Sequence, residues 1–188
     1  MSEEYPSNRR YGLLHLIGKD RTGILQDASA FVSEHGGRTE EGYAHSFGSE
    51  AVVLLYVSGL PNQIAEIEKS ASKLGECLKM LALFTSMNDL EEARTGKAIP
   101  MTLRVSSPDF AGLVAGMTTF LAERSLPIID HHTIRTTLPH AVGVRTHRHR
   151  FTVLLPPTFD RKVFLNEFDA LSHELNFMYD NINLSDFY

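Results

Sequence analysis

The chain has 188 residues, of which 43% are apolar and 22% are charged, and its formal charge at pH 7 is -5. This composition is typical of a packed protein of one large or two small domains, and the negative charge argues against direct binding of nucleic acid. The longest apolar stretches, such as residues 51–57, are too short to cross a bilayer, and the polar N-terminus lacks the apolar core of a secretion signal. We therefore expect a cytoplasmic protein that does not contact membranes. The single cysteine excludes an internal disulfide.

The first elements of the chain are a strand and a helix. Residues 1–10 are expected to form a flexible tail, and residues 13–18 a short apolar strand. The helix that follows runs to Glu34, where a histidine and two glycines end it. Asp20 or Thr22 is expected to accept hydrogen bonds from the free amides at its start.

Four more elements complete the first half. The turn residues Gly48 and Ser49 indicate a hairpin, and Pro61 indicates the start of a second helix with one apolar face. In chain order we predict strands at 39–47 and 51–59, a helix that begins at Pro61 and ends at Gly75, and a strand at 77–84.

The second half has the same order of elements. It contains strands at 101–106, 127–136, 150–155 and 176–183, with helices at 110–124 and 160–175. The order βαββαβ, found twice, predicts an α+β protein with two ferredoxin-like domains, each an antiparallel sheet with both helices on one face. The domains are expected at 11–87 and 100–188, with a charged linker at 88–99. Met101, Met117 and Phe120 are expected in the core.

An internal repeat supports this division. The sequence DRTGIL begins at Asp20 and DFAGLV begins at Asp109, an offset of 89 residues. The same offset relates Gly23 to Gly112, Phe31 to Phe120, Glu34 to Glu123, and Glu41 to Asp130. The two halves are therefore homologous.

Each half carries an Asp-x-x-Gly-apolar turn between its first strand and first helix. A pair of βαββαβ halves with this turn resembles tandem ACT domains, and the arrangement over residues 11–184 resembles the glycine cleavage system transcriptional repressor family. The resemblance implies an amino-acid ligand held at an interface between two domains or chains, self-association, and transcriptional control through a DNA-binding protein partner. It implies no cofactor.

The residues of the turn have the chemistry that a zwitterion requires. Gly23 lets a ligand approach the backbone, and the helix amides attract a carboxylate. Arg38 can bind the same carboxylate, and Asp20 or Glu41 can bind an ammonium group. Alternatively, Asp20 only caps the helix and Gly23 only makes room for packing. The candidate ligand-binding residues are Asp20, Arg21, Thr22, Gly23, Ile24, Leu25, Arg38 and Glu41 in the first half, with Asp109, Gly112, Leu113 and Asp130 in the second.

The second half also contains a cluster of histidines. His147 and His149 alternate along one strand, so either His131 or His132 on the neighbouring strand could join them in a metal site. The alternative is a solvated hairpin tip rich in arginine and histidine. The hairpin at 138–150 is longer than its counterpart in the first half, and its extra residues are a candidate surface for contact with a partner.

Catalysis has little support in the sequence. No nucleophile motif and no phosphate-binding loop is present. Glu40 and Glu41 form a carboxylate pair, but adjacent residues on a strand are expected to face opposite sides of the sheet. We therefore expect a non-enzymatic protein that binds an amino acid or a similar zwitterion and regulates a protein partner. The alternatives are an interaction module that needs no ligand and a metal-binding protein.

Overall fold

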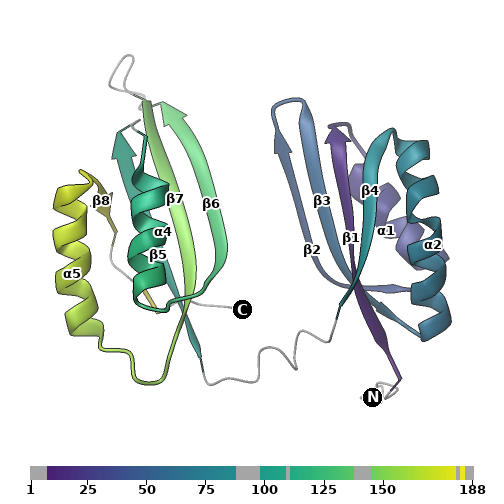
Figure 1. Ribbon diagram of the computed structural model, residues 1–188. Coiled ribbons are helices and arrows are strands. Elements are labelled where there is room, and N and C mark those ends of the chain that lie inside the picture. Colours follow the sequence, from purple (N-terminus) through teal and green to yellow (C-terminus); the bar gives the residue numbers. More distant parts are fainter. Residues whose placement is uncertain (1–7, 88–97, 109–110, 138–144, 181–182, 185–188) are drawn as a thin grey trace. The chain divides into compact units, whose positions relative to one another are not determined.

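The computed structural model describes residues 8–87, 98–108, 111–137, 145–180 and 183–184. The chain divides near residue 95 into two compact units. Each unit contains an antiparallel sheet with two helices on one face (Figure 1). The predicted pair of ferredoxin-like α+β domains is therefore confirmed. None of the helices in the described ranges is long and apolar enough to span a membrane.

The first unit has the strand order β2-β3-β1-β4. In chain order its elements are β1 (Arg10–Lys19), α1 (Ile24–Glu34), β2 (Arg38–Phe47), β3 (Glu50–Gly59), α2 (Pro61–Leu78) and β4 (Met80–Met87).

Alternation along the strands assigns side chains to the two faces of this sheet. Leu14 and Leu16 of β1 pair with Leu55 and Val53 of β3, and all four are buried in the core beneath the helices. The residues between them face the opposite side, which the helices do not cover and which we call the first open face. Its exposed apolar side chains are Ile17, Tyr43, Phe47, Leu81, Leu83 and Met87.

The prediction that Gly75 ends the second helix is wrong. Helix α2 continues to Leu78, and Lys79 takes the left-handed conformation that ends it, with φ 54°. Gly75 is buried inside the helix, where an added Cβ would lie 2.8 Å from the carbonyl oxygen of Met80 and 2.9 Å from Cβ of Ala82. The glycine is therefore explained by close packing of α2 on β4.

The second unit has the order β6-β7-β5-β8, with β9 also paired to β5. Its elements are β5 (Ile99–Pro108), α4 (Leu113–Glu123), β6 (Ile128–Thr137), β7 (Arg145–Leu155), α5 (Arg161–Glu174), β8 (Met178–Tyr179) and β9 (Asn183–Leu184). The core includes the predicted residues Met101, Met117 and Phe120.

Two strands of this unit differ from the prediction. Strand β7 begins at Arg145, not at residue 150. The polar residues 146–150 pair with β5 on one side, and residues 145–150 pair with β6 on the other. Residues 145–150 therefore belong to the sheet, while the rest of the predicted long hairpin, 138–144, lies outside the described residues. The last predicted strand, 176–183, is present as the two short strands β8 and β9.

Candidate functional site

The turn between β1 and α1 presents helix amides that no side chain caps. Gly23 occupies the N-cap position with φ 92°, and no side chain accepts a hydrogen bond there. The expected cap by Asp20 or Thr22 is therefore wrong. Because the cap position belongs to a residue without a side chain, Thr22 lies one residue too early and Asp20 three residues too early. The first-turn amides remain available to an anion.

The same feature recurs at the equivalent helix of the second unit. Helix α4 begins after Gly112, which has φ 108° and again provides no side-chain cap. The second helix of that unit is different, since the Asp160 carboxylate accepts hydrogen bonds from the amides of Lys162 at 2.9 Å and Val163 at 3.1 Å. Helix α2, whose N-cap is Leu60, also lacks a side-chain cap, so what sets the two glycine turns apart from the other helix starts is the positive φ of their N-cap residue.

Backbone conformation explains the two glycines, and close packing does not. An added Cβ at Gly23 would lie 3.7 Å from Nη1 of Arg21, its nearest neighbour, and one at Gly112 would meet no described atom within 4 Å. A positive φ is costly for any other residue type except asparagine or aspartate. The alternative that Gly23 only makes room for packing is wrong, and among the described residues no atom crowds the position of a side chain at either glycine.

The other residues of the first turn divide between core and surface. Ile24 is buried, whereas Leu25 is 48% exposed. The Arg21 guanidinium lies against the start of α1, where it donates a hydrogen bond to the carbonyl oxygen of Thr22 at 3.1 Å and forms an ion pair with Asp27. The turn thus combines backbone donors, a guanidinium and an exposed apolar side chain.

Arg38 and Glu41 lie at the opposite end of the sheet from this turn. The amide of Asp20 donates to the carbonyl oxygen of Ser49 at 2.8 Å, which places the turn beside the start of β3. Arg38 instead pairs with Ser58, near the end of β3. The nine residue steps from Ser49, directly before β3, to Ser58 span about 30 Å. One small ligand therefore cannot touch both groups of predicted residues within a single unit.

A β-bulge turns Glu40 and Glu41 toward the same face. The register between β2 and β3 shifts between Thr39 and Glu41, so Glu40 is the extra residue. Its carboxylate accepts a hydrogen bond from the hydroxyl of Ser58 and lies 3.6 Å from Nη2 of Arg9. The expectation that the two carboxylates face opposite sides is wrong, because the inserted residue interrupts the alternation.

Sequence reasoning missed two members of this group. Arg9 and Ser58 join Glu40 and Arg38, with Nε of Arg38 lying 3.8 Å from the Glu40 carboxylate. Arg9 lies within the segment expected to be a flexible tail. No sequence signal marks it, because Arg9 precedes β1, which β3 separates from the carboxylates of β2 in the sheet.

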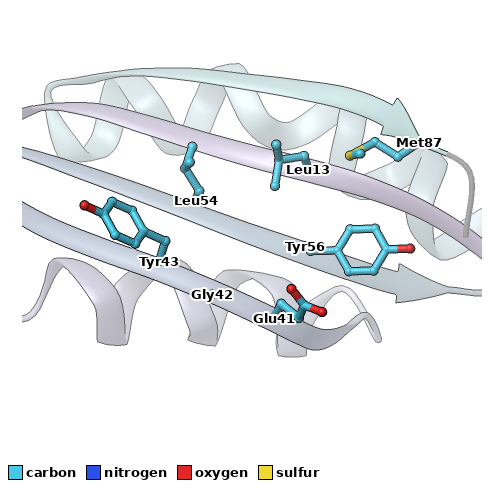
Figure 2. Close-up of a pocket in the computed structure, with 7 residues that line it drawn as sticks. All are labelled: Leu13, Glu41, Gly42, Tyr43, Leu54, Tyr56 and Met87. Atoms are coloured by element: carbon cyan, nitrogen blue, oxygen red, sulfur yellow. The ribbon is translucent and has the colours of Figure 1, made fainter. Parts of the chain in front are cut away.

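Glu41 also lines a shallow pocket on the first open face (Figure 2). The pocket has a volume of about 260 Å³. Its other lining residues are Leu13, Gly42, Tyr43, Leu54, Tyr56 and Met87, so its wall is mainly apolar and aromatic. A carboxylate beside such a wall can receive an ammonium group whose neighbouring atoms are apolar.

The second unit has the same separation between its predicted residues. Leu113, directly after Gly112, is buried, and Asp109 lies outside the described residues. Asp130 pairs with Thr152 on β7 and contacts a guanidinium nitrogen of Arg150 at 3.2 Å. The glycine turn follows the end of β5, which pairs with Thr146 of β7. The turn and Asp130 therefore lie toward opposite ends of the sheet.

The histidines gather on one face of the second sheet without forming a metal site. The rings of His131 and His149 are stacked with centroids 6.1 Å apart, and the ring of His147 lies 6.0 Å from that of His149. The Thr133 hydroxyl lies between two of them, 2.9 Å from Nδ1 of His149 and 3.0 Å from Nε2 of His131. His132 pairs with Arg150 and belongs to the other face. Within the described part of the chain no group of three donors could hold a metal ion, so this hypothesis is not supported.

Burial changes the protonation of this histidine group. Desolvation, together with the nearby His131 and His147, lowers the pKa of His149 to about 4. Desolvation also lowers the pKa of His131, against the raising effect of Asp130. The rings of His131 and His149 therefore favour the neutral form.

Comparison with known proteins places this fold among solved structures. No family model matches the chain, and no curated protein is significantly similar to it. A crystal structure provisionally assigned as a glycine cleavage system transcriptional repressor matches with a TM-score of 0.69 and 21% identity, over 94% of this chain and 98% of the other. An unknown protein from Galdieria sulphuraria matches with a TM-score of 0.75 and 19% identity, over 93% and 98% of the two chains. The chain shares the fold of these proteins across both of its units.

Proposed function

We propose that the chain is a non-enzymatic regulatory protein that binds an amino acid or a similar small zwitterion, and that the ligand changes its contact with a protein partner. One observation carries this proposal: in both units the first helix begins at a positive-φ glycine that provides no side-chain cap, and the described atoms leave the space above that glycine open. These amides and the positive end of the helix dipole stabilise a carboxylate.

The geometry favours a ligand bound between two copies. The turn at Gly23 supplies groups for the carboxylate, whereas Arg38 lies about 30 Å and Glu41 about 23 Å away along the strands. A ligand that uses both groups must take the turn from one copy and the β2 residues from another. Self-association then completes the site, and ligand binding strengthens that association by linkage.

The partner in this proposal is a DNA-binding protein. The likeness to a structure provisionally assigned as a transcriptional repressor supports a role in transcription. The net charge of -5 favours an indirect role, since an acidic protein is repelled by phosphates.

A thermal-shift screen against all twenty amino acids tests the ligand. A molecule that binds the folded state raises the melting temperature by mass action. The shift should disappear in Gly23→Val and Arg38→Ala and persist in Gly48→Ala, which adds a side chain at another positive-φ glycine with open space around it. Absence of any shift at millimolar ligand would refute the ligand-binding proposal.

Mixing variants tests the shared site. If one site uses the turn of one copy and Arg38 of another, then mixed oligomers of Gly23→Val and Arg38→Ala contain one intact site. The mixture should recover part of the shift that each variant alone has lost. No recovery, in a mixture shown to exchange subunits, would contradict a site shared between copies.

A second candidate function is an interaction module that needs no ligand. The exposed apolar side chains of the first open face favour it, since large apolar patches mark protein-binding surfaces. In that case the parent chain should bind its partner equally well with and without amino acids. Replacing Leu81 and Leu83 with glutamate should abolish this binding.

A further inference from the structure

The open face of the second sheet is cationic where that of the first is apolar. In β5, Met101, Leu103 and Val105 are buried in the core, so the alternate residue Arg104 faces the side without helices. Arg148 and Arg150 of β7 share that face. We call these three residues the arginine cluster.

The register brings the three guanidinium groups close together. Arg104 pairs directly with Arg150, which places their Cβ atoms about 5 Å apart. Arg148 lies two residues along β7, about 7 Å away. All three line one depression of about 380 Å³, together with Ser106, His132, Ile134 and other residues of the same sheet.

The positive charge of the cluster is only partly neutralised within the unit. Arg150 contacts the Asp130 carboxylate at 3.2 Å. Among the described residues, no carboxylate lies within ion-pair distance of Arg104 or Arg148, although Asp180 lines the same depression. Like charges directly opposite each other on neighbouring strands are destabilising. An anion in the depression would offset that repulsion.

Comparison of the two units shows that the cluster is specific to the second. Leu14 pairs with Leu55 in the first sheet, and Leu103 pairs with Phe151 in the second. Leu103 is therefore equivalent to Leu14, and Phe151 is equivalent to Leu55. The positions of the arginine cluster then correspond to His15, Val52 and Leu54 of the first unit. The fold does not require arginine at these positions, because the first unit forms the same sheet without them.

We propose that the arginine cluster is a binding site for a small molecule with at least two negative charges on phosphate or carboxylate groups. Guanidinium groups bind both kinds of oxyanion through paired charge-assisted hydrogen bonds. The depression has the volume of a small-molecule site. This site does not depend on the amino-acid site proposed above, and either can fail without the other.

Calorimetric titration of the full chain with pyrophosphate and with succinate, at about 50 mM salt, tests this site and distinguishes phosphate from carboxylate ligands. Arg104→Ala and Arg148→Ala should each weaken binding of the preferred anion by about tenfold or more. The matched control is Arg135→Ala, because Arg135 is an exposed arginine of the same hairpin that pairs with His147 on the other face. Its effect should remain within about twofold. The first two variants should fold, since each removes a repulsion.

Three results would overturn the proposal. The first is that neither anion binds the parent chain. The second is that Arg104→Ala and Arg148→Ala both bind the anion as well as the parent chain does. The third is that Arg135→Ala weakens anion binding as much as Arg104→Ala and Arg148→Ala do. Binding of a single-stranded oligonucleotide, without binding of either small anion, would also overturn it and would identify the cluster as a nucleic-acid surface.

Discussion

Acid should destabilise the second unit through His149. The pKa of this buried ring is lowered to about 4, mainly by desolvation, while a histidine in the unfolded chain has a pKa of about 6.5. Below pH 6.5 the unfolded state therefore takes up a proton that the folded state does not, and stability is lost as the pH falls toward about 4. Between pH 7.5 and pH 5 this difference lowers the free energy of unfolding by about 2 kcal/mol. His131, whose pKa is also lowered, contributes with the same sign.

The assay is urea unfolding at pH 7.5 and pH 5, followed through NMR signals of the second unit. The variant His149→Gln should lose most of the difference between the two pH values, because glutamine can keep a hydrogen bond to Thr133 and does not titrate. An NMR titration of the ring measures the pKa directly. A pKa near 6.5 for His149, or an unchanged pH difference in the variant, would refute the reasoning.

Four further substitutions test helix ends, a hairpin turn and packing, and circular dichroism during urea unfolding checks each of them. Gly75→Ala should destabilise the first unit by about 1–2 kcal/mol, because the clash with β4 outweighs the gain in helix propensity; a neutral effect would contradict the packing with Ala82. Gly23→Ala should cost about 1 kcal/mol through its positive φ alone, and Gly48→Ala should cost a similar amount. Asp160→Ala should cost about 1 kcal/mol, since it removes the cap of α5.

The order of elements could be predicted because the sequence contains it twice. Each uncertain assignment in one half was supported by its equivalent in the other, and the apolar periodicity was strong in both. The exact ends depended on backbone conformations that leave no clear mark in the sequence. Gly75 looked like a helix terminator, yet Lys79 takes the left-handed conformation. The sequence alone does not distinguish a glycine that permits close packing from a glycine that ends a helix.

The candidate site was predicted residue by residue but not as one arrangement. Helix α1 has 11 residues and returns the chain about 16 Å along the sheet. Strand β2 must therefore begin at the end opposite the turn, so topology alone could have separated Arg38 from Gly23. The bulge at Glu40 could not be foreseen, because it depends on how β2 pairs with β3.

The two open faces show how one duplicated fold can present two chemically different surfaces. Most residues that face the core stay apolar in both units, since they pack against the helices, as Leu14 and Leu103 do; the buried His149, at the position of Val53, is an exception. Residues on the open face are not restricted in this way. Leu54 can therefore become Arg150 without changing the sheet, while Glu41 and Asp130 keep a carboxylate at equivalent positions. In the first unit that carboxylate lies beside an apolar wall and suits a cation, whereas in the second it pairs with an arginine and leaves two other arginines for an anion.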